Sequence, residues 1–130
     1  MAEEKKEKRV LIVDNDPDYL DRLSDLFRGA GYQVTIMRRG RQVVDHVKKD
    51  KPTVIVMDVA LPDKDGVQVI KELKDDWDAK KVPVVVISDY TSRINASIRE
   101  KIEGVLPKPF SSDELLYEVQ KAVKKAESSS

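Results

Sequence analysis

The chain has no cysteine and only one histidine, His46. The lack of thiols excludes disulfides, iron–sulfur clusters, zinc–thiolate sites and a cysteine nucleophile, and a single histidine excludes a multi-histidine metal site. Neither sign of charge is in excess, because 24 basic residues balance 24 acidic ones. Bulk charge therefore gives no indication of nucleic-acid binding.

Long hydrophobic runs are also absent. No run approaches the roughly 18 apolar residues of a membrane-spanning helix, and the charged N-terminus has no apolar stretch of the kind found in a signal peptide. With 130 residues, 40% of them apolar and 37% charged, the chain is expected to form one cytoplasmic domain without membrane contact. We expect that domain to span residues 9–126, between a charged tail at 1–8 and a C-terminal tail or linker at 127–130.

Short apolar runs indicate buried strands. Three runs are apolar at every position: Val10–Val13, Val54–Met57 and Val84–Ile87. Continuous apolar runs of this length are typical of strands that are buried on both faces, as in a parallel sheet. Residues 32–37 and 105–106 are weaker candidates for two further strands.

Helix signals lie between these runs. Asp16 before Pro17 is a typical helix start, and Ser111 with Glu114 forms a capping box. Apolar residues at three- and four-residue spacing predict five helices, which begin near Pro17, Val43, Gly66, Ile94 and Ser111. Right-handed crossovers then place helices on both faces of a doubly wound, five-stranded parallel sheet, which is an α/β fold.

Polar residues follow the predicted strands at the edge where such sheets bind ligands. Asp14 follows the first strand and Asp58 the third, while Ser88 and Lys108 follow the fourth and fifth. Clustered carboxylates attract a hard divalent cation, and oxygen donors without thiols favour Mg²⁺ over zinc. A carboxylate can also attack a phosphoryl group, whose oxygens a hydroxyl and an ammonium can hold. We therefore predict magnesium-dependent phosphoryl chemistry at this edge.

These residues resemble the receiver domain of two-component response regulators, a CheY-like, flavodoxin-like family. The resemblance rests on residues 14–17, residues 58–66, Ser88 and residues 108–110, in that order and spacing, and it covers roughly residues 9–125. It implies the strand order 2-1-3-4-5. It also implies a signalling domain and not an enzyme, since such a domain promotes only its own phosphorylation and dephosphorylation. The implied partners are a histidine kinase or phosphotransfer protein, an output domain or downstream protein, and a second copy in a phosphorylation-dependent homodimer.

The resemblance assigns roles to single residues. Asp58 corresponds to the phosphoacceptor, and the resemblance implies that Ser88 and Lys108 bind its phosphoryl group. The implied Mg²⁺ ligands are Asp14, Asn15, Asp58 and the backbone carbonyl of Ala60, with Asp16 as a further candidate. Pro109 occupies the position of a cis proline in the family, and the X-Pro bond makes the cis form accessible.

Three departures from the family pattern bear on function. Asn15 stands where a metal-binding carboxylate is usual, so we expect weaker metal binding. Asp89 replaces a small residue beside Ser88, and we hypothesise that its charge partly compensates for Asn15. Val105 replaces the aromatic switch residue, and nearby Tyr90 is a candidate to take part in switching. These departures leave open a second interpretation, a receiver-fold interaction module that works without phosphorylation.

A third interpretation is a haloacid-dehalogenase-like phosphatase that uses Asp14 as its nucleophile. It leaves Asp58 without a role, and the late Gly-Asp pair of that fold is missing from the sequence. The sequence has neither a GxxxxGK[ST] nor a GxGxxG motif, which excludes the common phosphate-binding loops.

Two other features have structural interpretations. Arg38, Arg39 and Arg41 cluster before the second helix without interleaved aromatic residues. We therefore expect a solvated helix end and no direct contact with nucleic acid. Trp77 follows the third helix and is expected to pack a loop onto the sheet.

Overall fold

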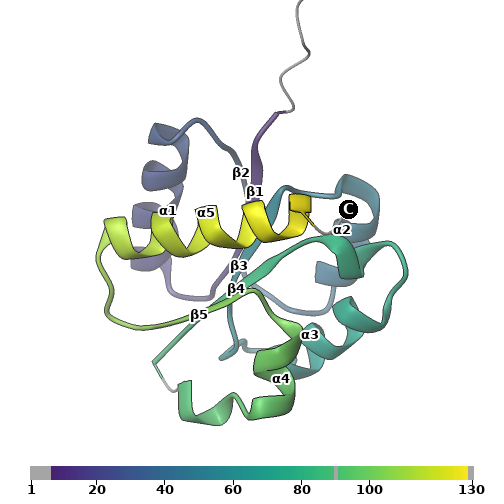
Figure 1. Cartoon of the computed structure of the whole chain (residues 1–130). Coiled ribbons are helices and arrows are strands. Elements are labelled where there is room, and N and C mark those ends of the chain that lie inside the picture. The colour runs from purple at the N-terminus through teal and green to yellow at the C-terminus, as the bar shows by residue number, and fades with distance from the viewer. Residues whose placement is uncertain (1–6, 90, 129–130) are drawn as a thin grey trace, which may run out of the picture.

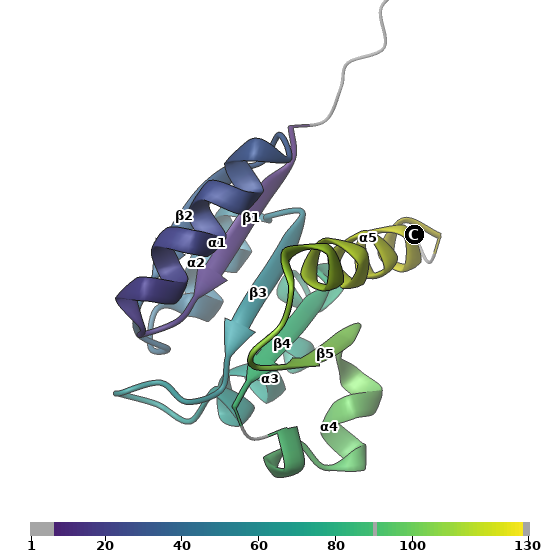
Figure 2. The ribbon, with the colours of Figure 1, turned by 90° about the vertical axis from the view of Figure 1, so that its left-hand side faces the viewer.

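Five parallel strands form one sheet in the order β2-β1-β3-β4-β5 (Figure 2). The structure is a computed structural model that describes residues 7–89 and 91–128. The strands are β1 (Arg9–Val13), β2 (Gln33–Met37), β3 (Val54–Asp58), β4 (Val84–Ser88) and β5 (Gly104–Pro107). The doubly wound α/β fold and the strand order are both confirmed.

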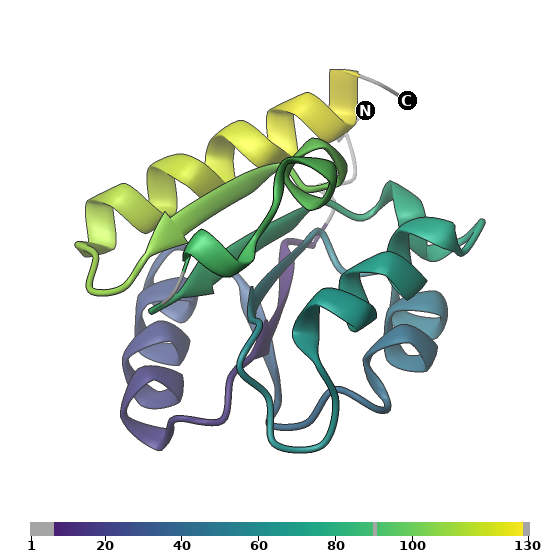
Figure 3. The ribbon, with the colours of Figure 1, turned by 90° about the horizontal axis from the view of Figure 1, so that it is seen from below.

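Helices cover both faces of this sheet (Figure 1, Figure 3). The α-helices are α1 (Pro17–Gly29), α2 (Val43–Asp50), α3 (Gly66–Asp75), α4 (Ala96–Lys101) and α5 (Ser112–Ser128). Two short 3₁₀ helices, η1 (Ala79–Lys81) and η2 (Thr91–Arg93), precede and follow β4. Among the described residues, no helix has the length and apolar character needed to cross a membrane.

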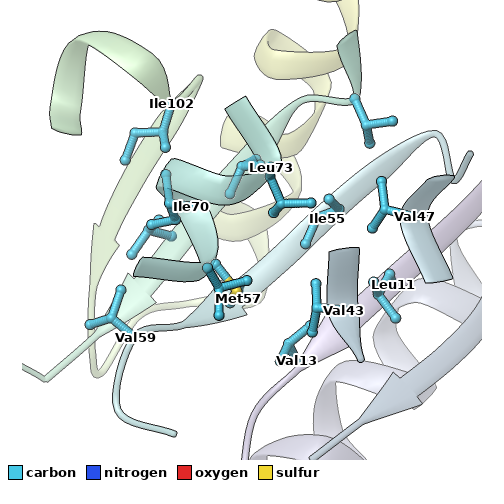
Figure 4. Packing of buried hydrophobic residues seen from close by; sticks show 14 of the residues in the cluster. Leu11, Val13, Val43, Val47, Ile55, Met57, Val59, Ile70, Leu73 and Ile102 are labelled. Atoms are coloured by element: carbon cyan, nitrogen blue, oxygen red, sulfur yellow. The ribbon is translucent and has the colours of Figure 1, made fainter. Parts of the chain in front are cut away.

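The alternation of side chains along each strand produces two hydrophobic cores. Leu11 and Ile55 point into the core beneath α2, α3 and α4, together with Val43, Ile70 and Leu73 (Figure 4). Their strand neighbours belong to the core beneath α1 and α5: Val10, Ile12, Val54 and Val56. Because both faces are covered, β1 and β3 carry apolar residues at successive positions.

Isoleucines recur every four residues at Ile94, Ile98 and Ile102, a spacing that predicts a longer fourth helix than the structure contains. The side chain of Asn95 caps α4 by accepting the Ile98 N–H at 3.0 Å. Ile94 therefore precedes the helix and Ile102 follows it, although all three isoleucines are buried in the same core. The four-residue spacing reports burial on one face and not the extent of the helix.

Two other details differ from expectation. The predicted packing of Trp77 is wrong, since this side chain is 73% exposed and the Lys80 ammonium lies 3.9 Å from its ring centroid. Helix α5 runs to Ser128, two residues beyond the predicted end of the domain at residue 126.

Candidate functional site

Strand register brings the polar strand ends together. Val13 pairs with Met57, so Asp14 and Asp58 lie next to each other at the carboxyl edge of the central strands. Ser88, the last residue of β4, pairs with Pro107 of β5. Lys108 follows directly and donates its backbone N–H to the Ser88 carbonyl at 2.9 Å.

Lys108 bridges the two carboxylates. Its Nζ lies 2.7 Å from Asp58 Oδ2 and 2.9 Å from Asp14 Oδ2. The Lys108 side chain is only 3% exposed, and both aspartates are buried. Charged groups are rarely buried unless they are paired, so this arrangement holds two negative charges at one place with one positive charge.

The backbone fixes the other oxygen of each carboxylate. Asp14 Oδ1 accepts the Asp16 N–H and Asp58 Oδ1 accepts the Ala60 N–H, both at 2.9 Å. Both bonds close tight turns at the ends of β1 and β3. The two carboxylates are therefore held in fixed positions before any ligand binds.

Burial and charge act on this cluster in opposite directions. Burial raises the pKa of Asp14, and the hydrogen bonds from Asp16 and Lys108 offset that rise only in part. Burial lowers the pKa of Lys108, but the hydrogen bonds and charges of Asp58 and Asp14 outweigh it, so the Lys108 pKa is raised. Lys108 therefore remains an ammonium at neutral pH.

The oxygen atoms of Asp14 and Asp58 suit a hard cation that takes few ligands from the protein. After Lys108 is counted, Asp14 and Asp58 leave an excess of one negative charge. Within residues 7–89 and 91–128, no three acidic, histidine or cysteine side chains cluster as a metal site. A cation here would thus meet two carboxylates and otherwise neutral oxygens. Mg²⁺ is commonly bound by one or two carboxylates, with water and phosphate oxygens completing its shell.

The other predicted site residues have different surroundings. Ser88 is buried at the same edge, whereas Asn15 and Asp16 are exposed. Asp16 caps α1 by accepting the Asp18 N–H at 3.0 Å, which accounts for it without a metal. The Lys108–Pro109 peptide bond is cis.

Two of the three other switch candidates, Asp89 and Val105, lie within the described residues. Asp89 is exposed. Val105 is half-buried and packs against the core beneath α2, α3 and α4. Tyr90 lies outside the described residues.

Tyr19 also belongs to the site, through a contact with Lys108 that the sequence does not predict. The face of its ring lies over Lys108, with Nζ 4.0 Å from the ring centroid. The ring also contacts Phe110 at a centroid distance of 5.9 Å. Its position one turn after the acidic cluster is the only sequence signal that could have suggested this contact.

A second unforeseen contact fixes the loop after Asp58. Asp63 accepts the Gly40 N–H at 2.8 Å and the Arg41 N–H at 3.1 Å, which ties the β3–α3 loop to the β2–α2 loop. The hydrogen bond from Gly40 is the largest cause of a pKa of Asp63 below its usual 3.8. Arg38, Arg39 and Arg41 are exposed beside this contact.

Gly66 allows the same loop to return close to the site. A Cβ added at Gly66 would lie 2.4 Å from the Cα of Val59, the residue after Asp58. Only glycine lets α3 start at this distance from the strand end.

Comparison with known proteins agrees with this geometry. The family model of the response regulator receiver domain matches residues 10–120. The chain belongs to the response regulator receiver domain family, a signalling domain of two-component systems. This membership argues against the phosphatase alternative, which assigned the chain to a different family.

Individual relatives give the extent of the similarity. The chain is 32% identical over 108 residues to the response regulator MprA of Mycolicibacterium vanbaalenii, a match that covers 83% of this chain and 47% of MprA. The chain thus spans about half the length of the curated relatives it matches.

Solved structures show the same fold. A putative response regulator from Chloroflexus aurantiacus has a TM-score of 0.84 and 29% identity, covering 92% of this chain and 99% of that one. The receiver domain of the sensor histidine kinase PA1611 from Pseudomonas aeruginosa has a TM-score of 0.83 and 24% identity, with the same two coverages. That structure contains a magnesium ion coordinated in its active-site cleft.

Proposed function

We propose that this domain accepts a phosphoryl group on Asp58 from a histidine kinase or phosphotransfer protein and acts as a conformational switch. The observation that carries the proposal is the buried triad of Asp14, Asp58 and Lys108, with Nζ 2.9 and 2.7 Å from the two carboxylates. A structural salt bridge needs only one carboxylate. The second one leaves an excess negative charge at the ligand-binding edge of the sheet, and this is a feature of a functional site.

The proposed chemistry is an in-line transfer. A carboxylate oxygen of Asp58 attacks phosphorus, the bond to the donor breaks, and the donor leaves with the bonding electron pair as an imidazole or an acetate. Ala60 and Lys108 already hold the attacking carboxylate through hydrogen bonds. Lys108 is close enough to move from the carboxylate to an oxygen of the incoming phosphoryl group, and the buried Ser88 hydroxyl would turn toward another.

The proposed cofactor is Mg²⁺. Asp14, Asp58 and the backbone carbonyl of Ala60 would hold it, with the Asn15 amide as a neutral ligand. When bound, the ion would neutralise the carboxylates and the phosphoryl oxygens. Because Asp16 is occupied as a helix cap, it is a weaker candidate. The exposed Asp89 would add negative charge from the β4 side and partly replace the carboxylate that Asn15 lacks.

The proposed partners follow from family membership. Receiver domains interact with histidine kinases and output domains, and the relatives are about twice as long as the matched region. We place the transfer in the cytoplasm. The new charge on Asp58 would bias two arrangements of the β4–α4 segment, changing the affinity for an output domain, a downstream protein or a second copy.

Phosphorylation by a small donor tests this proposal. The protein is incubated with acetyl phosphate, with Mg²⁺ or with EDTA, and its intact mass is measured. Asp58→Asn is the critical variant, and Asp25→Asn on the exposed face of α1 is the matched control. We expect one phosphoryl adduct in the wild type and in Asp25→Asn, and none in Asp58→Asn or without the metal.

Two results would overturn the proposal. One is an equal adduct in Asp58→Asn, which would place the phosphoryl group elsewhere. The other is no adduct in the wild type together with no binding of beryllofluoride at high Mg²⁺ concentration. That outcome would favour the interaction module that works without phosphorylation.

A further inference from the structure

Tyr19 places an aromatic ring on the charged centre of the site. The Lys108 ammonium has three close neighbours: the carboxylates of Asp14 and Asp58, and the ring of Tyr19 at 4.0 Å from its centroid. A cation at this distance over a ring face is attracted by the negative face of the π-system. The attraction is stronger where water is excluded, and the Lys108 side chain is 3% exposed.

Neighbouring elements hold the ring in place. Tyr19 lies in the first turn of α1, whose start is fixed by the Asp16 cap and by Pro17. On the other side, Phe110 packs against the ring at 5.9 Å with the ring planes inclined by 49°. The ring thus connects the start of α1 to the segment after Lys108.

The ring and not the hydroxyl makes the contact. Within residues 7–89 and 91–128, the Tyr19 hydroxyl has no hydrogen-bond partner. Phenylalanine at this position should therefore keep the interaction, whereas leucine would keep only the apolar volume.

We propose that Tyr19 is a positioning residue for phosphoryl transfer, whose ring holds the Lys108 ammonium in contact with Asp58 and with the incoming phosphoryl oxygens. This inference rests on the proposed function. Without the ring, Lys108 keeps its charge and its carboxylate partners but gains freedom and water contact on its third side. The lysine then stabilises the charge of the transition state less well, because that stabilisation depends on prior orientation.

Two measurements on the same variants test the proposal. The first is the NMR shift of the Lys108 ε-methylene protons, which a ring face moves upfield. The second is the initial rate of phosphorylation by acetyl phosphate at saturating Mg²⁺. The variants are Tyr19→Phe and Tyr19→Leu. Tyr117→Leu is the matched control, since Tyr117 is exposed on α5 and stacks with Lys121 at 5.1 Å.

We expect Tyr19→Phe and the control to keep the upfield shift of Lys108 and a rate within about twofold of wild type. Tyr19→Leu should lose the shift and phosphorylate roughly threefold to tenfold more slowly, a size between those of exposed and of desolvated cation–π contacts. Circular dichroism of each variant shows that it is folded.

The proposal is overturned if the wild-type Lys108 protons are not shifted, a result that needs no variant. It is also overturned if Tyr19→Leu phosphorylates at the wild-type rate, or if Tyr19→Phe is as slow as Tyr19→Leu. If the wild type takes up no phosphoryl group, the proposed function fails, and the Lys108 shift alone decides whether Tyr19 holds the lysine.

Discussion

The positive charge of Lys108 allows the carboxylates of Asp14 and Asp58 to be buried side by side. Asp14 and Asp58 are both held by backbone N–H groups, so neither can turn away from the other. Removal of one partner from a buried ion pair leaves an uncompensated charge, which usually costs more than the pair contributed.

We predict that Lys108→Met lowers the free energy of unfolding by about 3 kcal/mol in buffer without Mg²⁺. Urea unfolding followed by circular dichroism measures this difference. Lys101→Met, at an exposed position of α4, removes a solvated lysine and should change stability little. Equal stability of Lys108→Met and wild type would mean that the carboxylates do not depend on the lysine in the folded state.

At the residue scale, sequence predicted the strand-end groups but not their surroundings. Asp14, Asp58 and Lys108 could be placed because they directly follow strands that sheet register aligns. The contact of the Tyr19 ring with Lys108 could not be predicted, because it depends on the rotation of α1 and on the path of the chain after Lys108. Neither is encoded in a short motif.

At the element scale, another ion pair connects parts of the chain that lie away from the triad of Asp14, Asp58 and Lys108. The Lys74 ammonium of α3 lies 2.7 Å from Glu103, which precedes β5, and also contacts the Val82 carbonyl at 3.3 Å. Glu103 in turn accepts the Val84 N–H of β4 at 3.1 Å. The pair therefore holds the α4–β5 connection against α3 and β4.

Lys74→Met is expected to lower the free energy of unfolding by about 1 to 2 kcal/mol, since the half-buried Glu103 carboxylate is left with fewer hydrogen-bond donors. The amide hydrogen exchange of residues 102–104 should become faster by more than the loss of overall folding stability explains. Lys71→Met, on the exposed side of the same helix, provides the comparison. Unchanged exchange at these amides would show that the pair does not hold the connection.

The Asp63 contact between two loops predicts a defined pH dependence. The pKa of Asp63 in the folded protein lies below its usual value of 3.8. A lowered carboxyl pKa adds stability that is fully present above the unfolded value and lost as pH falls through the folded one. The stability difference between wild type and Asp63→Asn should therefore be constant from about pH 7 to 5 and shrink below about pH 4.

An NMR titration of the Asp63 carboxyl carbon checks this directly. We expect a midpoint below 3.8. A midpoint at or above that value would contradict the hydrogen bonds from Gly40 and Arg41.

Element boundaries were less predictable than element types. The spacing of Ile94, Ile98 and Ile102 correctly indicated one buried face, but Asn95 sets the start of α4 through its side chain. The predicted burial of Trp77 was wrong because it was argued from residue type alone. Hydrophobicity alone predicts burial, but the ring is 73% exposed and lies beneath the Lys80 ammonium.

At the scale of the whole molecule, short apolar runs that form strands alternate with segments of helical spacing, and this alternation determined the fold. Runs that are apolar at every position require cover on both faces, and helices between successive parallel strands provide it. The same topology brings the carboxyl ends of β1, β3, β4 and β5 to one edge. Residues 14, 58, 88 and 108, separated by up to 94 positions in the chain, meet there.

The decisive question for this edge of the sheet is whether Asp58 carries the phosphoryl group. Borohydride reduction after acetyl phosphate treatment answers it, because it converts a phosphorylated aspartate into homoserine that peptide mass spectrometry can locate. We expect homoserine at position 58 alone, and only when Mg²⁺ is present. Homoserine at position 14, or at neither position in a protein that carries the phosphoryl mass, would show that Asp58 is not the phosphoacceptor.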